Sequence, residues 1–234
     1  MSAAAAASLI LAGLAAWAGA GFAAWSQGYA RRLRAGAAAN AETLWGAARR
    51  AYGRAPVRWP DALCGALAGG AVFWLSWDQA GLGLAGGVLC LGLGALAFLD
   101  WHSGLLPDAL TLPLMGLGWL CGPLGLVPAV LLSGLVWCGL AGLAWAYHRM
   151  RGQAGLGGGD VKCLAMLAAW LGGPLVSVVL WLACVLGVLW WLSGWAGRRS
   201  SYPFGPCLSL AALPWVLLGP DRAHACLGLV LGAV

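Results

Sequence analysis

The sequence predicts an all-α, polytopic membrane protein with about 8 transmembrane helices. Its composition is the first reason, because 62% of the residues are hydrophobic and only 9% are charged, whereas soluble domains carry about 25% charged residues. The second reason is that apolar runs follow one another along the chain, separated by short breaks of Gly, Pro and charged residues. About 20 apolar residues are enough to cross the hydrocarbon layer as a helix. Both observations argue against a soluble enzyme.

The N-terminal part of the chain differs from the rest. Residues 3–25 form an apolar run with no positive charge before it, so we expect a retained first helix and not a cleaved leader. Residues 26–60 are the one extended polar segment, and the apolar positions of Asn40–Tyr52 recur at helical spacing. This pattern predicts a short amphipathic helix on the membrane surface. We therefore divide the chain into residues 1–60, a helix with a basic cytoplasmic segment, and 61–234, a transmembrane core.

The transmembrane core contains a series of further apolar runs. They predict helices over residues 61–77, 81–99, 108–121, 126–147, 160–172, 175–195 and 207–234, the last interrupted at 219–222 so that it spans once and then turns back. If the polar N-terminal segment is cytoplasmic, alternation puts every Lys and Arg except Arg222 on or beside the cytoplasmic side. The net charge of +6 then serves topology and lipid head groups, and we expect no nucleic-acid partner.

Two carboxylates occupy the ends of two predicted spans. Asp100 ends one apolar run, and Asp160 follows a glycine-rich loop and opens another. Alternation places both at the cytoplasmic boundary, where ionisable groups are costly and are functional candidates. Two carboxylates that share a proton can activate water and protonate a peptide group. We therefore interpret Asp100 and Asp160 as a catalytic pair, with a simple helix cap as the alternative for Asp160.

Residues near this pair have competing interpretations. Asp108 follows Pro107 and opens a helix, so a helix cap is the favoured interpretation. Lys162 lies two positions after Asp160 and points away from it on a helix, which favours an interfacial anchor over a role in tuning the pair. Gly157 and Gly159 form either a flexible turn or a loop that lets a substrate backbone approach free amide groups.

No cofactor is expected from the sequence. His102 and His148 lack matched spacing on one helix, so a metal site is not favoured. Ser103 and Cys163 have no oriented histidine in the sequence pattern that would make them nucleophiles. The 8 cysteines include no C-x-x-C pair and lie in or beside apolar runs, where they are expected as small buried side chains.

Taken together, these motifs resemble the prepilin peptidase (type IV leader peptidase) family of GxGD-type intramembrane aspartic proteases. The matching stretches are Asp100 with Leu106-Pro107-Asp108, then Gly157-x-Gly159-Asp160-x-Lys162, then Tyr202-Pro203-Phe204-Gly205-Pro206. The resemblance covers roughly residues 58–219. It implies catalysis by Asp100 and Asp160 in a multi-pass protein of the bacterial inner membrane. The implied partners are membrane lipid and a prepilin or pseudopilin, cut at its leader peptide just before its N-terminal helix.

The resemblance leaves one activity and one alternative open. Many members also N-methylate the new N-terminus and carry two C-x-x-C pairs after the first helix, but this chain has no such pair. N-methyltransferase activity is therefore left open. A presenilin-type protease is not favoured, because no Pro-Ala-Leu signature lies near the C-terminus. The non-enzymatic alternative is a membrane transporter or scaffold whose carboxylates form an ion site.

Overall fold

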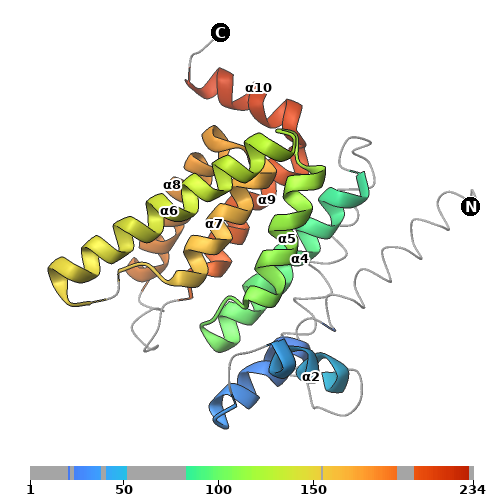
Figure 1. The fold of residues 1–234 in the computed structure, drawn as a ribbon, viewed down its shortest axis with the longest axis vertical. Coiled ribbons are helices and arrows are strands. Elements are labelled where there is room, and N and C mark those ends of the chain that lie inside the picture. The colour runs from blue at the N-terminus through green and yellow to red at the C-terminus, as the bar shows by residue number, and fades with distance from the viewer. Residues whose placement is uncertain are drawn as a thin grey trace, which may run out of the picture.

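The computed structural model describes residues 21, 24–37, 41–51, 83–153, 155–193 and 203–231, and all regular structure in these residues is helical. Residues 24–34 are helical and precede the labelled helices of Figure 1. Those helices are α2 (Ala41–Ala51), α4 (Gly83–Ser103), α5 (Asp108–Cys121), α6 (Leu126–Arg151), α7 (Gly158–Leu171), α8 (Gly173–Leu192), α9 (Gly205–Leu218) and α10 (Pro220–Leu231). The all-α prediction is confirmed for this part of the chain.

Helix α7 is the centre of the bundle. It packs against α5, α6, α8 and α9, and Figure 1 shows it between α5 and α6. Its side chains from Cys163 to Leu171 are all buried, as expected for a helix that is apolar on every face. The only charged residues of α7, Asp160 and Lys162, lie among its first five residues. The fold thus places Asp160 at the end of the most enclosed helix.

Close packing of small and large residues joins α7 to α5. The indole nitrogen of Trp170 donates a hydrogen bond to the carbonyl oxygen of Leu114 at 2.8 Å. The ring needs the space left by Gly118, because a Cβ there would lie 2.7 Å from a ring carbon of Trp170. Small residues that let helices approach closely are typical of membrane bundles. This contact fixes how α5 and α7 lie relative to each other along their length.

The outer helices carry apolar side chains on the outside of the bundle. Helices α4, α6 and α8 are long and apolar enough to cross a membrane, and α5 and α9 are shorter apolar helices. On α6 and α8, large side chains such as Leu131, Leu135 and Trp181 are exposed, which is the arrangement expected for surfaces that face lipid. The chain is a polytopic membrane protein.

Most predicted boundaries lie within a few residues of the observed ones. Helix α4 continues to Ser103, three residues beyond Asp100, and α7 begins at Gly158, two residues before Asp160. The interruption predicted at 219–222 is seen, since α9 ends at Leu218 and α10 begins at Pro220. The predicted span 61–77 and nearly all of 3–25 lie outside the described residues.

The predicted amphipathic helix is confirmed as α2, but its apolar face packs on the protein itself. Leu44 is completely buried in a cluster with Trp25, Tyr29 and Leu99. The indole nitrogen of Trp25 also donates a hydrogen bond to the carbonyl oxygen of Leu44 at 2.8 Å. Helix α2 therefore lies against the end of α4 that carries Asp100, while α10 lies at the opposite end of the bundle (Figure 1).

Candidate active site

Asp100 lies in the last turn of α4 and is held by a residue from the other end of the chain. Its side chain is only 5% exposed, and its Oδ2 accepts a hydrogen bond from the backbone N–H of Gly205 at 2.7 Å. Gly205 is the first residue of α9, so its amide has no partner within its own helix. A Cβ at this position would lie 2.8 Å from the same oxygen. Helix α9 thus presents a free amide to Asp100, and only glycine fits there without a shift.

Asp160 is the third residue of α7, and its carboxylate turns back toward the start of that helix. The N-cap residue is Gly157, whose backbone amide hydrogen-bonds the Asp160 carboxylate. A Cβ on Gly157 would lie 2.8 Å from Oδ2 of Asp160. This is the geometry of the N3 side chain in a capping box. Gly157 and not Asp160 occupies the N-cap position, but the contact of Asp160 with the Gly157 amide still caps the start of the helix, so the helix-cap alternative remains open.

The structure brings the two candidate acids to the same end of the bundle. The charge of Asp100 acts on Asp160, and Cys163, one turn further along α7, experiences both carboxylates. Cys163 itself is buried in the apolar core. Two carboxylates this near each other in a poorly hydrated site do not both ionise readily, so they can share a proton. This is the arrangement that the acid–base interpretation of the sequence requires.

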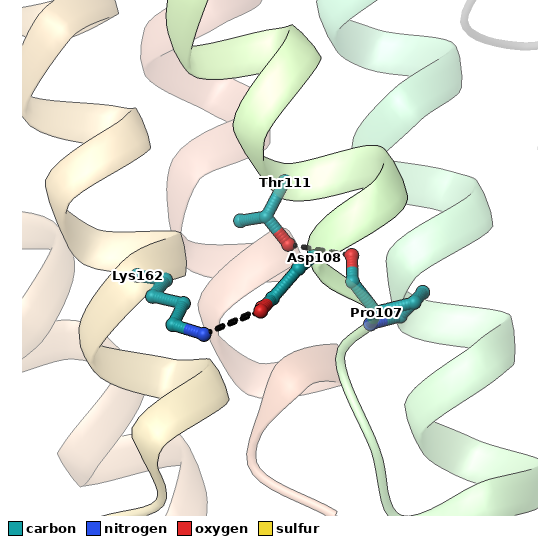
Figure 2. A network of polar contacts seen from close by, with 4 residues as sticks. All are labelled: Pro107, Asp108, Thr111 and Lys162. Carbon is teal, nitrogen blue, oxygen red and sulfur yellow. Dashed lines mark hydrogen bonds and ion pairs between the residues drawn. The ribbon is translucent and has the colours of Figure 1, made fainter. Parts of the chain in front are cut away.

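Asp108 and Lys162 form an ion pair with each other, which corrects the interpretation of Asp108. The amine Nζ of Lys162 donates to both carboxylate oxygens of Asp108, at 2.7 and 2.6 Å (Figure 2). The N-cap of α5 is Pro107, and Asp108 makes no side-chain capping hydrogen bond. The helix-cap prediction for Asp108 is therefore wrong. Lys162 does point away from Asp160, as predicted, but it reaches the start of α5 and does not extend only toward a lipid surface.

Gly159 is packed against the α4–α5 loop. A Cβ at Gly159 would lie 2.9 Å from the Cβ of Leu106, an atom that cannot rotate away. Together with the Gly157–Asp160 contact, this favours the close-approach interpretation of the glycines over that of a merely flexible turn. The α4–α5 loop therefore packs directly against the backbone of the first turn of α7.

A groove opens beside this contact. Its volume is ≈ 690 Å³, and its walls include apolar residues of the α4–α5 loop and α5 together with the first turn of α7. Leu105, Leu112 and Pro113 contribute apolar surface, while Asp108 and Lys162 contribute the charged part. Gly158 and Gly159 also line it, so the groove runs directly beside the turn that carries Asp160.

The remaining polar candidates form hydrogen bonds with nearby groups. Nδ1 of His102 lies 2.8 Å from the carbonyl oxygen of Phe98 and 3.2 Å from Oγ of Ser26. The hydroxyl of Ser103 donates to the carbonyl oxygen of Leu99 at 2.6 Å. Among the described residues, no three His, Cys, Asp or Glu side chains group in a way that could hold a metal ion.

Gly205 is the residue of this site for which the sequence indicated no role. The Tyr-Pro-Phe-Gly-Pro stretch was recognisable as a motif, and its position directly before an apolar run was the available signal. Tyr202 lies outside the described residues. The contact between Gly205 and Asp100 joins positions that are 105 residues apart, and local sequence patterns do not report such a contact.

Comparison with known proteins identifies the region that contains both acids. Residues 87–192 match the type IV leader peptidase family. The prepilin leader peptidase/N-methyltransferase of Burkholderia pseudomallei is 35% identical over 168 residues, covering 66% of this chain and 52% of the relative. The protein of the same name from Pseudomonas aeruginosa is 35% identical over 167 residues, covering 67% and 56%. That from Xanthomonas campestris is 36% identical over 139 residues, covering 56% and 47%.

These matches have clear limits in extent. The chain spans about half the length of the curated relatives it matches. No solved structure matches it. The matched region runs from α4 to α8 and includes Asp100, Asp160, the glycine loop and the Asp108–Lys162 pair. Residues 87–192 of this chain are therefore the part that is similar to the type IV leader peptidase family.

Proposed function

We propose that this chain is an aspartic prepilin leader peptidase of the bacterial inner membrane. In this proposal Asp100 and Asp160 together hydrolyse one peptide bond of a prepilin or pseudopilin, at the boundary between membrane and cytoplasm. The main support is geometric: the last turn of α4, with Asp100, and the start of α7, with Asp160, lie at one end of the bundle, where the loop after α4 packs against Gly159. The names of the relatives, which are prepilin leader peptidases, support the substrate class.

The chemistry needs only the two carboxylates and a water molecule. One carboxylate accepts a proton from the water as its oxygen attacks the peptide carbonyl carbon, and the protonated partner donates to the carbonyl oxygen. The resulting tetrahedral gem-diol breaks at the C–N bond, and the leaving amine takes up the proton that the base has gained. As the C=O bond re-forms, one hydroxyl of the intermediate returns its proton to the carboxylate that had donated. The products are a new carboxyl group and a new amine, and the pair again shares one proton.

The surroundings of the acids fit this chemistry. The first turn of α7 has amide groups without helical partners, which can stabilise negative charge on a carbonyl oxygen. The groove beside Gly158 and Gly159 gives an extended polypeptide access to that turn. Because apolar helix surface surrounds this end of the bundle, a substrate helix can remain in the bilayer while its leader lies in the groove.

The test is the cleavage of a prepilin by defined variants. The type IV prepilin of Pseudomonas aeruginosa is co-expressed with this chain in a host that lacks its own leader peptidase, and cleavage is scored as a mobility shift. We expect Asp100→Asn and Asp160→Asn each to lower the cleavage rate by about 10²- to 10⁴-fold, as for loss of a general acid or base. Wild-type cleavage by both variants would refute the proposal.

Two controls make this experiment interpretable. Glu42→Gln removes a carboxylate that is exposed on α2 and should cleave like the wild type. Immunoblots of inner-membrane fractions report whether each variant accumulates in the proposed location. An ion-conducting protein without protease activity would instead leave the prepilin uncut even with both acids present.

A further inference from the structure

The Asp108–Lys162 ion pair connects the two segments that carry the acids. Asp108 opens α5, eight residues after Asp100, and Lys162 lies two residues after Asp160 in α7. Both carboxylate oxygens of Asp108 are within 2.7 Å of the lysine amine. In Figure 2 the lysine side chain crosses the space between α7 and the start of α5. The pair is thus a direct link between the neighbourhoods of Asp100 and Asp160.

A second contact at the same place shows how close these segments lie. Leu106, in the loop that joins Asp100 to Asp108, packs against Gly159 with no space for a methyl group. The start of α5 is also ordered by Thr111, whose hydroxyl donates to the carbonyl oxygen of Pro107 at 2.9 Å. The loop is therefore pressed against α7 on one side of the acid pair, and the ion pair closes the same junction from the groove side.

Stability alone is a poor explanation for this ion pair. The side chains of Lys162 and Asp108 are 26% and 51% exposed, and exposed ion pairs typically contribute little to folding because solvent screens them. The ion pair is more important for where it holds the start of α5 than for its contribution to folding stability. A small displacement of the α5 start would move the loop that leads back to Asp100 and would change the groove beside Gly159.

We propose that Asp108 and Lys162 are positioning residues: their ion pair clamps the start of α5 to the first turn of α7 and so holds the groove wall and the two acid-bearing segments in register. The inference rests on the proposed peptidase function. It assigns neither residue to proton transfer. Its consequence is that the complementarity of the two charges matters, and not the identity of the residue at either position.

A charge exchange tests the clamp. Kinetics are measured for the full chain in detergent with the Pseudomonas aeruginosa prepilin as substrate. We expect Lys162→Glu and Asp108→Lys each to lower kcat about tenfold, since misplacement by a fraction of an ångström is costly. The double variant D108K/K162E should recover to within about threefold of the wild type, and Lys162→Arg should remain close to it. A double variant as impaired as the single ones would overturn the inference.

Two further measurements separate the clamp from other effects. Arg151→Glu introduces the same charge change at the exposed end of α6 and should leave cleavage unchanged. Hydrogen exchange of the backbone amides of residues 104–106 should accelerate in Lys162→Gln and return toward the wild-type rate in D108K/K162E. Unchanged exchange in Lys162→Gln would reject the clamp whether or not the chain cleaves prepilin. Cleavage by Asp160→Asn would reject the proposed function and leave the exchange result standing.

Discussion

Asp100 and Asp108 are eight residues apart and both lie at a helix boundary, yet the fold treats them in opposite ways. Asp100 is buried, and its recorded partner is the neutral backbone amide of Gly205. Asp108 is half exposed and is paired with a cation, Lys162. A cation beside two neighbouring carboxylates would favour the ionised form of both and prevent them from sharing a proton. Lys162 points away from Asp160 and its amine contacts Asp108 at the groove.

The comparison indicates how a carboxylate can be fixed without a cation. A backbone amide at a helix start is rigid, carries no net charge and directs its hydrogen along one line. It can therefore orient Asp100 without placing a positive charge beside it. The Asp108–Lys162 pair is a different kind of contact, because it joins two partly exposed side chains of opposite charge. The Gly205 amide thus orients a candidate catalytic acid, whereas the Asp108–Lys162 pair joins two helices.

The largest expected effect comes from the Asp100 side, through Gly205→Ala. The new Cβ would lie within 3.0 Å of three atoms of the Asp100 side chain, so that side chain must move. We expect cleavage to fall by about 10²-fold, as for a catalytic group displaced by about 1 Å. The measurement is kcat on prepilin together with thermal unfolding in detergent.

The matched control for this substitution is Gly94→Ala, in the middle of α4. A Cβ there meets nothing within 4 Å, and alanine favours the helix. This variant should keep wild-type activity and the same or a slightly higher unfolding temperature. If Gly205→Ala is as active as Gly94→Ala, the amide of Gly205 does not position Asp100 for catalysis.

A smaller loss of cleavage is expected for Gly159→Ala, at the contact between α7 and the loop that joins Asp100 to Asp108. The added methyl group would overlap the Cβ of Leu106 and push the α4–α5 loop away from α7. Overpacking of this kind costs about 1–3 kcal/mol, part of which the loop can relieve by moving toward the groove. We expect cleavage to fall about tenfold, since a partly relieved displacement is smaller than the one at Gly205.

Gly158→Ala gives the comparison within the same turn. A Cβ at Gly158 meets nothing within 4 Å, so its effect on cleavage should be much smaller than that of Gly159→Ala. Equal losses in the two variants would indicate that backbone freedom of the glycine loop matters, and that the contact with Leu106 does not.

The sequence predicted the positions of the helices and the candidate acids, but not the residues that contact these acids in the fold. Apolar runs predicted α4 to α10 to within a few residues, because each run is long and its ends carry Gly, Pro or charge. The family resemblance is confirmed for residues 87–192, while the catalytic roles of Asp100 and Asp160 stay a prediction. Local rules treated Asp108 as a helix cap because they consider only neighbours in the chain. The pairing with Lys162, 54 residues away, depends on how α5 and α7 pack.

The smallest effect on cleavage is expected from Leu44→Ala, because it weakens a support shared by both sides. Leu44 is fully buried in the cluster that contains Leu99, next to Asp100, and against which Ala109, next to Asp108, also packs. Removing such a side chain costs about 2–5 kcal/mol of local stability, which should loosen α2 more than the bundle. Limited proteolysis should cut near α2 much faster, while cleavage of prepilin falls only a few-fold. Glu42→Ala, exposed on the same helix, should change neither. A loss of cleavage in Leu44→Ala as large as that of Gly205→Ala would show that α2 directly influences the positions of Asp100 and Asp160. The difference between Asp100 and Asp108 would then depend on α2 as well as on the contacts of the two side chains.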